Sequence, residues 1–274
     1  MTINLRGTLF DLTQPQVMGI LNVTPDSFYA ASRVQEEDAV RRRADEILKE
    51  GAAIIDVGAY STRPGASTVS EEEEQRRLTA ALSVIRRDHP HAIVSIDTFR
   101  SQVARRCVED FGADIINDIS GGLQDEAMFP TVADLRVPYV LTHNTPIDAA
   151  SLGDDALAAA VAREWATNLQ RLYDLGVSDV ILDPGFGFSK TLEQNYVLMR
   201  RLPDLVRTFP DNAVLVGVSR KSMIWRLLNT SPEEALTGTT VLHTVALEAG
   251  ARLLRVHDVR AAVEAIRVWQ SVHS

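Results

Sequence analysis

Polar and charged side chains recur in this sequence at one kind of position, where a short apolar run ends. The positions are Asn22, Ser61-Thr62-Arg63, Asp97, Asn117-Asp118, His143, Asp183, Ser219-Arg220-Lys221 and Arg255-Val256-His257. Carboxylates and an amide combined with a lysine suit a flat heterocycle that carries several hydrogen-bond donors and acceptors. Arginine and histidine suit a phosphate or pyrophosphate, because guanidinium N–H groups match the geometry of phosphate oxygens. The residue types therefore indicate a site for a polar ring beside a phosphorylated group.

The apolar runs themselves predict the fold. They cover residues 17–23, 53–59, 92–98, 114–120, 138–143, 179–185, 213–219 and 253–259, and helical periodicities lie between them. Near-continuous apolar runs that alternate with helices are typical of a parallel sheet covered on its outer side. Eight such units favour closure into a barrel over an open sheet. We therefore predict an α/β fold, a (β/α)8 TIM barrel, that forms a single domain over residues 1–274, because no linker or composition break divides the chain.

Barrel enzymes build their sites at the carboxyl ends of the strands, so the polar residues should meet on one face. Each of them also has a structural interpretation. Asp97 and Ser219 could cap the helices that follow them, Asp183 could begin a turn, and Asn117 could satisfy loop amides. Arg255 could be a surface charge, although it lies within an apolar run. These interpretations do not explain why eight strands end in the same way.

Composition and charge exclude other classes of protein. The net charge of −9 and the aromatic content of 6% argue against a nucleic-acid surface, which needs clustered cations and aromatic side chains. No apolar stretch approaches the length of a membrane helix, and the amino terminus lacks the pattern of a secretory signal. The single cysteine, Cys107, cannot form an internal disulfide and lies among the apolar positions of its predicted helix. We therefore expect a cytoplasmic protein without a membrane or nucleic-acid partner.

Other local patterns have simple interpretations. The acidic run Glu71–Glu74 follows Ser70, which predicts a capped helix with an acid-rich first turn. The chain has no Walker A sequence and no GxGxxG motif opening a βαβ unit, so a nucleotide cofactor is not indicated. We expect no histidine-based zinc site, and His89 and His91, which precede an apolar run at the opposite end of the barrel, should be solvated. Two loops, residues 24–34 and 60–70, are longer than the barrel requires and are typical of lids.

The motifs at the strand ends resemble those of one family, the dihydropteroate synthases. The matching segments are GILNVTPDSF (19–28), STRPGA (61–66), SIDTFR (95–100), INDISGG (116–122), ILDPGFGFSK (181–190), GVSRKS (217–222) and RVHDV (255–259). They occur in the order and at the spacing of the family, over almost the whole chain. The resemblance implies condensation of 6-hydroxymethyl-7,8-dihydropterin diphosphate with p-aminobenzoate, which gives 7,8-dihydropteroate and pyrophosphate. It also implies a Mg²⁺ cofactor, competition by sulfonamides and a homodimer.

The resemblance assigns roles to individual residues at the matching positions. The pterin ring would be bound by Asp97, Asn117, Asp183, Lys221 and Arg255. The diphosphate would be bound by Thr62, Arg63, Arg255 and His257, and Mg²⁺ by Asn22. The p-aminobenzoate would be bound by Thr62, Pro64, Phe188, Ser219 and Lys221. Catalysis would rest on Asn22, Arg63, Lys221, Arg255 and His257, which stabilise the departing pyrophosphate and the pterin without an enzyme nucleophile.

Three positions depart from the family pattern, and two other functions remain open. Ala30 stands where an aspartate is frequent, Tyr60 replaces a glutamate, and Asn144 replaces a methionine after His143. A methyltetrahydrofolate-dependent methyltransferase shares the barrel and the pterin-binding Asp and Asn, but it has no use for a diphosphate site. A catalytically silent pterin-binding paralogue is the second alternative, because the altered first loop could have lost turnover.

Overall fold

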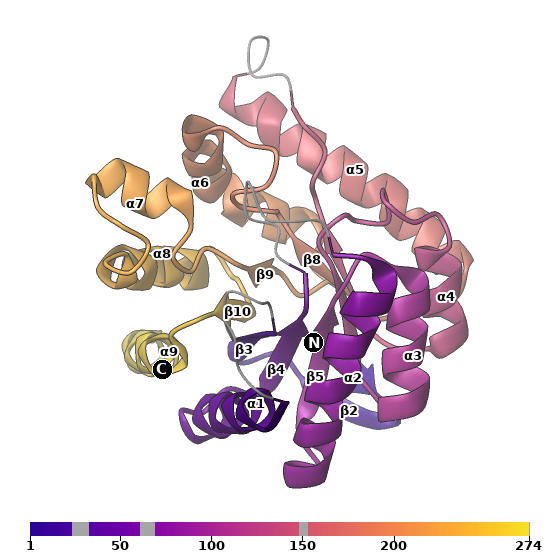
Figure 1. Ribbon diagram of the computed structural model, residues 1–274. Helices are drawn as coiled ribbons and strands as arrows, with labels where there is room; N and C mark the ends of the chain where they lie inside the picture. The colour runs from indigo at the N-terminus through magenta and orange to yellow at the C-terminus, as the bar shows by residue number, and fades with distance from the viewer. Residues whose placement is uncertain (24–32, 61–68, 148–152, 274) are drawn as a thin grey trace.

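Eight parallel strands form the centre of the molecule, as the apolar runs predict (Figure 1). The computed structural model describes residues 1–23, 33–60, 69–147 and 153–273. The strands are β3 (Gln16–Asn22), β4 (Ile54–Gly58), β5 (Ile93–Asp97), β6 (Ile115–Asp118), β7 (Tyr139–Thr142), β8 (Val180–Asp183), β9 (Leu215–Val216) and β10 (Leu253–Val256). Their order in the sheet is β8-β7-β6-β5-β4-β3-β10-β9. All eight lie within the runs predicted from sequence, apart from Gln16, which extends β3 by one residue.

The sheet closes on itself between β8 and β9. The link is a parallel bridge that pairs Leu182 with Val214, and Leu182 N donates to Ala213 O at 2.8 Å. On the other side of β9, Leu253 and Leu254 of β10 pair with its two residues. The prediction of a barrel is therefore confirmed, although the seventh strand is shorter than its apolar run suggested.

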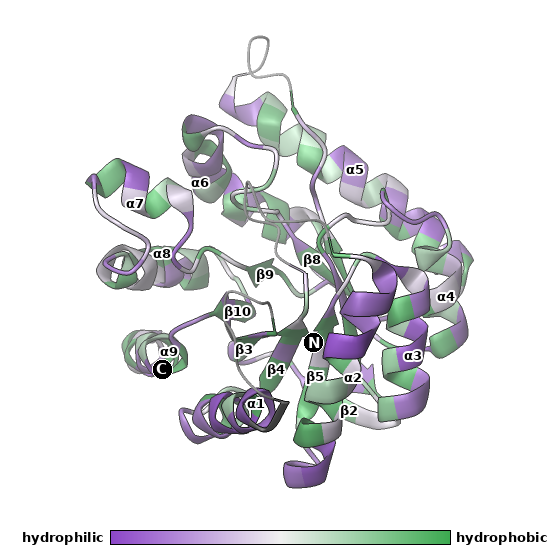
Figure 2. Cartoon of the chain, in the orientation of Figure 1, coloured by the Kyte–Doolittle hydropathy of each residue, from purple (hydrophilic) through white to green (hydrophobic). Residues whose placement is uncertain are grey.

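Helices surround the barrel and cover its outer face (Figure 1). They are α1 (Arg33–Lys49), α2 (Glu71–Asp88), α3 (Ser101–Phe111), α4 (Met128–Leu135), α5 (Asp154–Asp174), α6 (Leu192–Thr208), α7 (Ser222–Leu228), α8 (Leu236–Glu248) and α9 (Val259–His273). Figure 2 shows apolar residues on the strands and both apolar and polar residues on the helices, as expected for amphipathic helices on a buried sheet. Within the described ranges, no helix combines the length and the apolarity needed to cross a membrane.

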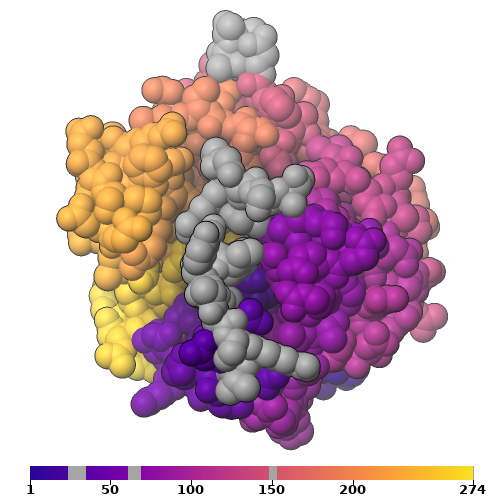
Figure 3. Space-filling model, viewed as in Figure 1, coloured from indigo at the N-terminus to yellow at the C-terminus, as the bar shows by residue number. Residues whose placement is uncertain are grey.

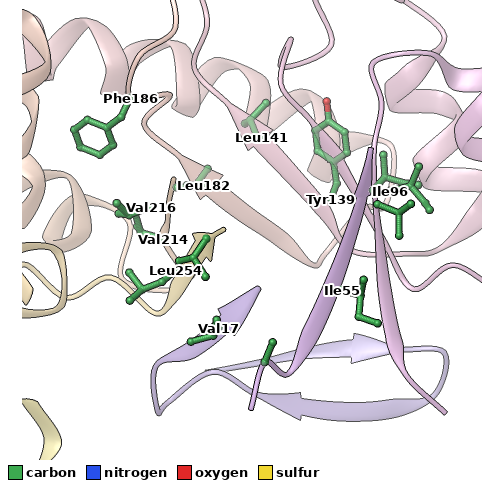
Figure 4. Packing of buried hydrophobic residues seen from close by; sticks show 14 of the residues in the cluster. Val17, Ile55, Ile96, Tyr139, Leu141, Leu182, Phe186, Val214, Val216 and Leu254 are labelled. Atoms are coloured by element: carbon green, nitrogen blue, oxygen red, sulfur yellow. The ribbon is translucent and has the colours of Figure 1, made fainter. Parts of the chain in front are cut away.

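A continuous hydrophobic layer fills the space between strands and helices. Figure 4 shows side chains from several strands in this layer, among them Ile55, Ile96, Leu182 and Leu254. Residues at alternate positions of a strand point to the same face, so the residues between these point into the barrel. Cys107 belongs to the outer layer and is fully buried there. Burial raises the pKa of its thiol to about 12, in agreement with the prediction of a small core residue.

Local signals in the sequence fix the ends of several helices. Ser70 caps α2, with its hydroxyl accepting from Glu73 N at 3.2 Å, as predicted. Thr191 and Gln194 form a reciprocal capping box at the start of α6. Gly112 ends α3 in the left-handed region, with φ of 60°, which glycine adopts at little cost. Asp97 and Ser219 cap no helix, because α3 and α7 begin after Arg100 and Lys221.

An amino-terminal hairpin, which the sequence analysis did not predict, closes the bottom of the barrel. Strands β1 (Thr2–Leu5) and β2 (Thr8–Asp11) pair antiparallel around a turn at Arg6 and Gly7, whose φ angles are 49° and 90°. Two consecutive positive φ values are the mark of a two-residue hairpin turn. Buried side chains of this segment pack against the inward-facing residues near the amino ends of the strands, in a second apolar cluster. Its members are Ile3, Leu5, Leu12, Met18, Ile54, Ile115, Val140, Ile181, Ala213, Leu215 and Leu253.

Candidate active site

The inward-facing residues change character along the strands. Near the amino ends they are apolar and form the cluster that contacts the hairpin. One pleat repeat further, the inward positions are Ile20, Asp56, Ser95, Asn117, Thr142, Asp183, Gly217 and Arg255. Most of these are polar, and all lie toward the carboxyl ends of the strands. Because alternate residues of a strand face the same side, polar groups from separate strands lie in one space, as predicted from the sequence.

Arg255 of β10 forms the centre of this polar set. Its Nε donates to Asp56 Oδ2 at 2.6 Å and its Nη2 donates to Asp97 Oδ2 at 2.5 Å. Asn117 Nδ2 lies 3.3 Å and 3.2 Å from the two carboxylate oxygens of Asp56. Strand β10 does not neighbour β4 or β5 in the sheet, so these contacts cross the interior of the barrel. Arg255 is therefore a buried partner of two carboxylates and not a surface charge.

Burial and charge shift the pKa values of this group. Burial raises the pKa of Asp97 to about 7, and the neighbouring carboxylate of Asp56 adds to the rise, although Arg255 opposes it. For Arg255, burial disfavours the charged form, but the attraction of Asp56 and Asp97 outweighs it and raises the pKa. The guanidinium is thus permanently charged. Asp97 is thus more easily protonated than an exposed aspartate, which is typical of functional sites.

Asp183 and Lys221 lie on the opposite wall of the same space. Gly217 has no side chain, and a Cβ at this position would lie 3.8 Å from Arg255 Cβ, 3.9 Å from Lys221 Nζ and 4.0 Å from Asp183 Oδ2. The glycine thus keeps open a space that these three side chains border. Burial raises the pKa of Asp183 and lowers that of Lys221 to about 8. A carboxylate and an ammonium next to a gap can take a ring with both donors and acceptors.

The segment after β8 supplies a carbonyl and an aromatic ring to this wall. Lys221 Nζ donates to Phe186 O at 2.5 Å and lies 4.3 Å from the centre of the Phe188 ring. Gly185 N donates to Asp183 Oδ1 at 2.8 Å. The turn at Asp183 predicted from its DPG sequence is therefore present, and it engages one carboxylate oxygen of Asp183. Phe188 and Lys221, both predicted site residues, therefore lie side by side.

Ser219 and His257 are joined by a hydrogen bond between the last two strand ends. His257 N donates to Ser219 Oγ at 3.1 Å, so the hydroxyl proton of Ser219 can be given to another acceptor. Arg43 of α1 holds the same loop, because its Nη2 donates to His257 O at 2.6 Å. The backbone beside the predicted diphosphate residue His257 is therefore fixed from two sides.

Asn22 lies next to Asp97 at the ends of β3 and β5. A Cβ on Gly58 would lie 3.6 Å from Asn22 Oδ1 and 3.4 Å from Asp97 Oδ2. Because Gly58 has no side chain, the amide oxygen of Asn22 and the carboxylate of Asp97 can both approach the backbone of β4 closely. Both are the hard oxygen ligands that Mg²⁺ prefers.

Some predicted residues are not brought into the site, and some cannot be placed. Asp118 faces away from the others and satisfies loop amides, accepting from Ser120 N at 2.7 Å and from Tyr139 Oη at 2.7 Å. Arg220 makes a two-bond ion pair with Asp258 at 2.8 Å and 2.7 Å. Three predicted residues lie outside the described residues, as do most of the two predicted lids: Thr62, Arg63 and Pro64.

Asp56 is the residue that the sequence analysis missed. It is fully buried in the middle of β4 and holds both Arg255 and Asn117. The other polar residues mark strand ends, whereas Asp56 precedes the end of its strand by one pleat repeat. A lone carboxylate inside the apolar run AIIDVGA (53–59) was the signal, because an unpaired buried charge is too costly to persist.

Two of the departures from the family pattern make definite contacts. The Tyr60 ring packs edge-to-face on Phe99 with 5.2 Å between centroids, and the Arg100 guanidinium lies 5.7 Å from the Tyr60 ring. Asn144 Nδ2 donates to Ile119 O at 2.9 Å, and its Oδ1 accepts from Ser189 Oγ at 2.9 Å. Tyr60 and Asn144 thus serve as contacts between loops, while Ala30 lies outside the described residues.

Comparison with known proteins places the chain in a family. The family described as pterin binding enzyme matches residues 18–257. The dihydropteroate synthase of Escherichia coli K12 is 38% identical over 279 residues, which cover 100% of this chain and 97% of the relative. Two solved dihydropteroate synthases superpose closely. That of Coxiella burnetii with pteroic acid has a TM-score of 0.88 and 35% identity, covering 100% of this chain and 98% of the other. That of Xanthomonas albilineans with 4-aminobenzoic acid has a TM-score of 0.87 and 36% identity, with the same coverage. The chain therefore belongs to the pterin binding enzymes and, among them, to the dihydropteroate synthases.

Proposed function

We propose that this chain joins 6-hydroxymethyl-7,8-dihydropterin diphosphate to p-aminobenzoate inside the carboxyl end of its barrel. The observation that carries this proposal is the convergence of Asp56, Asp97 and Asn117 on Arg255, with Asp183 and Lys221 across the same space. Such a set offers acceptors for the amino and N–H groups of a pterin and donors for its oxygen. Its cationic members would attract a departing diphosphate.

Recognition of the pterin rests on the acidic and amide groups. Asp97, Asn117 and Asp183 would hold the edge of the ring, with Lys221 on its oxygen side and Arg255 against the ring. A carboxylate that faces an amino group and a ring N–H makes two charge-assisted bonds. A ring without that edge leaves the buried carboxylate unpaired, which costs about 1–3 kcal/mol or more.

The reaction itself would need no enzyme nucleophile. The bond between the methylene carbon and the diphosphate oxygen breaks, and its electron pair leaves with pyrophosphate. The amine nitrogen of p-aminobenzoate then attacks the methylene carbon and releases one proton to solvent. Arg255 and His257, with Thr62 and Arg63, would hold the departing anion, while Asp97 would stabilise positive charge on the ring. Catalysis therefore depends on placed charges.

The residues present also fit the proposed Mg²⁺. Asn22 would hold the cation, and the metal would neutralise charge on the diphosphate when bound. Among the residues the structure describes, no group of three or more His, Cys, Asp or Glu gathers around a cation position. Mg²⁺ needs few protein ligands, because it commonly keeps waters and substrate phosphates as its other ligands.

The p-aminobenzoate would lie between the segment after β8 and the start of α7. Ser219 and Lys221 are the donors for its carboxylate, and Phe188 would form one wall of the ring, with Thr62 and Pro64 on the other side. The free proton of the Ser219 hydroxyl supports this assignment. Because sulfonamides mimic this acid, they should compete with it and not with the pterin.

Self-association is the remaining part of the proposal. Exposed apolar side chains gather on the adjoining helices α7, α8 and α9, which occupy one flank of the molecule (Figure 3). They are Leu227, Leu228, Leu236, Val241, Val245, Val268 and Val272. Such a surface is typical of an interface, and a homodimer in the cytoplasm would cover it. Val241→Asp should then give a monomer in size-exclusion chromatography with light scattering.

One assay separates this function from its two alternatives. Purified protein with Mg²⁺ should release pyrophosphate only when the pterin diphosphate and p-aminobenzoate are both present. Methyl transfer from methyltetrahydrofolate to a corrinoid protein, without pyrophosphate release, would identify a methyltransferase. Pterin binding without turnover under any of these conditions would identify a silent paralogue. Either result contradicts the proposal.

A further inference from the structure

Lysine is rare in this chain, and its positions are informative. The sequence has lysine only at Lys49, Lys190 and Lys221, whereas arginine supplies the other cations. Lys49 is exposed on α1, and Lys221 belongs to the site described above. Lys190 follows the segment after β8 and has no role in the proposed reaction. An ammonium carries three donors at one point, which an arginine fork cannot imitate, so the structure around Lys190 should show why lysine is used.

The Lys190 ammonium gathers acceptors from two loops. Its Nζ lies 3.1 Å from His143 O and 3.2 Å from His143 Nδ1, both in the loop after β7. It also lies 3.0 Å from Gly185 O and 3.2 Å from Phe188 O, in the segment after β8. One cation thus binds both ends of residues 185–188 to the neighbouring loop.

His143 and Glu164 orient this cation from its far side. His143 is 1% exposed, and its Nδ1 can accept from the ammonium only if the ring proton is on Nε2. Nε2 lies 3.3 Å from Glu164 Oε2 of α5. Burial, aided by the charge of Lys190, lowers the pKa of His143 to about 3, so the ring stays neutral. The result is a chain of contacts from Glu164 through His143 to Lys190.

Residues 185–188, which Lys190 holds, contain backbone groups that orient two predicted pterin-binding side chains. Gly185 N donates to Asp183, and Phe186 O accepts from Lys221. Gly185 has φ of 71°, and a Cβ there would lie 2.0 Å from His143 O. The backbone therefore passes so close to the loop after β7 that only glycine fits, and Lys190 bonds to the carbonyls on both sides of this approach.

We propose that Lys190, oriented by His143 and Glu164, is a positioning residue for pterin recognition. It fixes residues 185–188 in the conformation that directs Asp183 and Lys221 into the site, without touching the substrate itself. This inference rests on the proposed function, because it names the residue that shapes the same pterin subsite from outside.

Protonation of Lys190 is part of this role. The charged or titratable groups around it are Asp183 and Glu164, whose carboxylates favour its charge, Lys221, which opposes it, and neutral His143. Burial has the largest effect and lowers the pKa of Lys190 to about 7. Below that pH the ammonium can hold the carbonyls. Above it the neutral amine has lost a donor and its charge, so pterin affinity should fall as pH rises.

The test compares Lys190→Met with Lys190→Arg, and uses Lys49→Met as the matched control. Binding of 6-hydroxymethylpterin is measured by calorimetry at pH 6 and pH 8.5, together with KM and kcat for the pterin diphosphate. Lys190→Met should weaken pterin binding about 10-fold or more at pH 6 and should make the loss between the two pH values smaller, leaving the part that Asp97 and Lys221 contribute. Lys190→Arg keeps a cation at both pH values, so it should recover part of the affinity and show the same smaller pH dependence as Lys190→Met. Lys49→Met should match the wild type.

A spectroscopic measurement decides the question even if Lys190→Met does not fold. Wild-type protein labelled with ¹³C at the lysine ε carbon gives one signal for each of Lys49, Lys190 and Lys221. The Lys190 signal should titrate near pH 7 and move when the pterin binds. In Glu164→Gln it should titrate at lower pH, because the carboxylate that favours the charged form is gone.

The outcomes separate failure of this inference from failure of the proposed function. Wild-type protein that binds no pterin contradicts the proposed function. Wild-type binding with unchanged affinity and pH dependence in Lys190→Met overturns only the role of Lys190. A Lys190 signal that titrates like that of Lys49 and ignores the pterin overturns it as well.

Discussion

The two ends of the barrel interior are built from the same strands, but one end stabilises the fold and the other offers polar groups to a ligand. At the amino end, inward-facing apolar residues such as Ile54 and Ile181 pack against the hairpin residues Ile3 and Leu12. One pleat repeat further, Asp56 and Asp183 replace them on the same strands. The amino end lowers the free energy of the folded state by excluding water. The carboxyl end holds buried charges whose remaining bonding capacity is available to a ligand.

Replacement of a carboxylate at the carboxyl end should have the largest functional effect. Asp97→Ala removes an acceptor of the pterin edge and a partner of Arg255, so kcat/KM should fall about 1,000-fold or more, as two lost charge-assisted bonds imply. The free energy of unfolding should change little, because Asp56 still pairs with Arg255. Calorimetry with the pterin and urea unfolding measure the two effects.

Arg63→Ala supplies the contrast to this variant. It should leave pterin binding nearly intact and lower kcat, because Arg63 is assigned to the departing diphosphate. Equal activity of the Asp97 and Arg63 variants would contradict the residue assignment.

Replacement at the amino end should have the reverse pattern. Leu12 is fully buried between the hairpin and the barrel, so Leu12→Ala should lower the free energy of unfolding by about 3 kcal/mol through the cavity it leaves. Pterin affinity should stay within about two-fold of the wild type. Leu9→Ala is the control, because Leu9 is 71% exposed on the same hairpin. A large loss of affinity without loss of stability in Leu12→Ala would show that the two ends are not independent.

The barrel could be predicted from sequence because its strands are local apolar runs with a regular repeat. The hairpin could not be predicted in the same way, because β2 reads TLFD with only one partly buried residue and its pairing depends on the two-residue turn at Arg6. Its local signal in the sequence is Gly7, because glycine readily adopts the positive φ angle of a two-residue hairpin turn.

The site residues that could be predicted from sequence are those at the ends of strands. Asp97, Asn117 and Asp183 met as expected, because parallel strands bring their carboxyl ends to one face. Asp56 was missed because it lies within its strand, and the role of Lys190 was missed because its contacts come from the separate loop of His143. Long-range partners of this kind depend on the closed barrel and have no local signal.

The helical layer outside the barrel also contains a buried polar group, the ring of a histidine. His243 of α8 is 2% exposed, and neither ring nitrogen has a hydrogen-bond partner within the described part of the chain. Burial lowers its pKa to about 4. The unfolded chain binds this proton below pH 6.5 and the folded chain only below about 4, so stability falls as pH drops between these values, by up to about 3 kcal/mol.

His243→Leu should flatten this loss of stability. Urea unfolding at pH 7, 5.5 and 4.5 measures it, and His91→Leu is the control because His91 is exposed. If the slope in His243→Leu equals that of the wild type, the buried ring has no energetic cost. Activity at pH 7 should be unchanged in both variants, which would separate a buried polar group of the helical layer from those of the barrel interior.

The smallest expected effect concerns a loop contact at the carboxyl end. Asn144 joins Ile119 O to Ser189 Oγ, and Ser189 stands in the left-handed region with φ of 48°, next to Lys190. Asn144→Ala should lower the free energy of unfolding by about 1 kcal/mol and raise the KM for p-aminobenzoate a few-fold, because Phe188 lies in the loosened segment. Asn144→Met also lacks both hydrogen bonds, so its KM should rise to a similar extent. Steady-state kinetics with both variants show whether Asn144 affects binding of p-aminobenzoate. An unchanged KM in Asn144→Ala would mean that Asn144 contributes to stability alone.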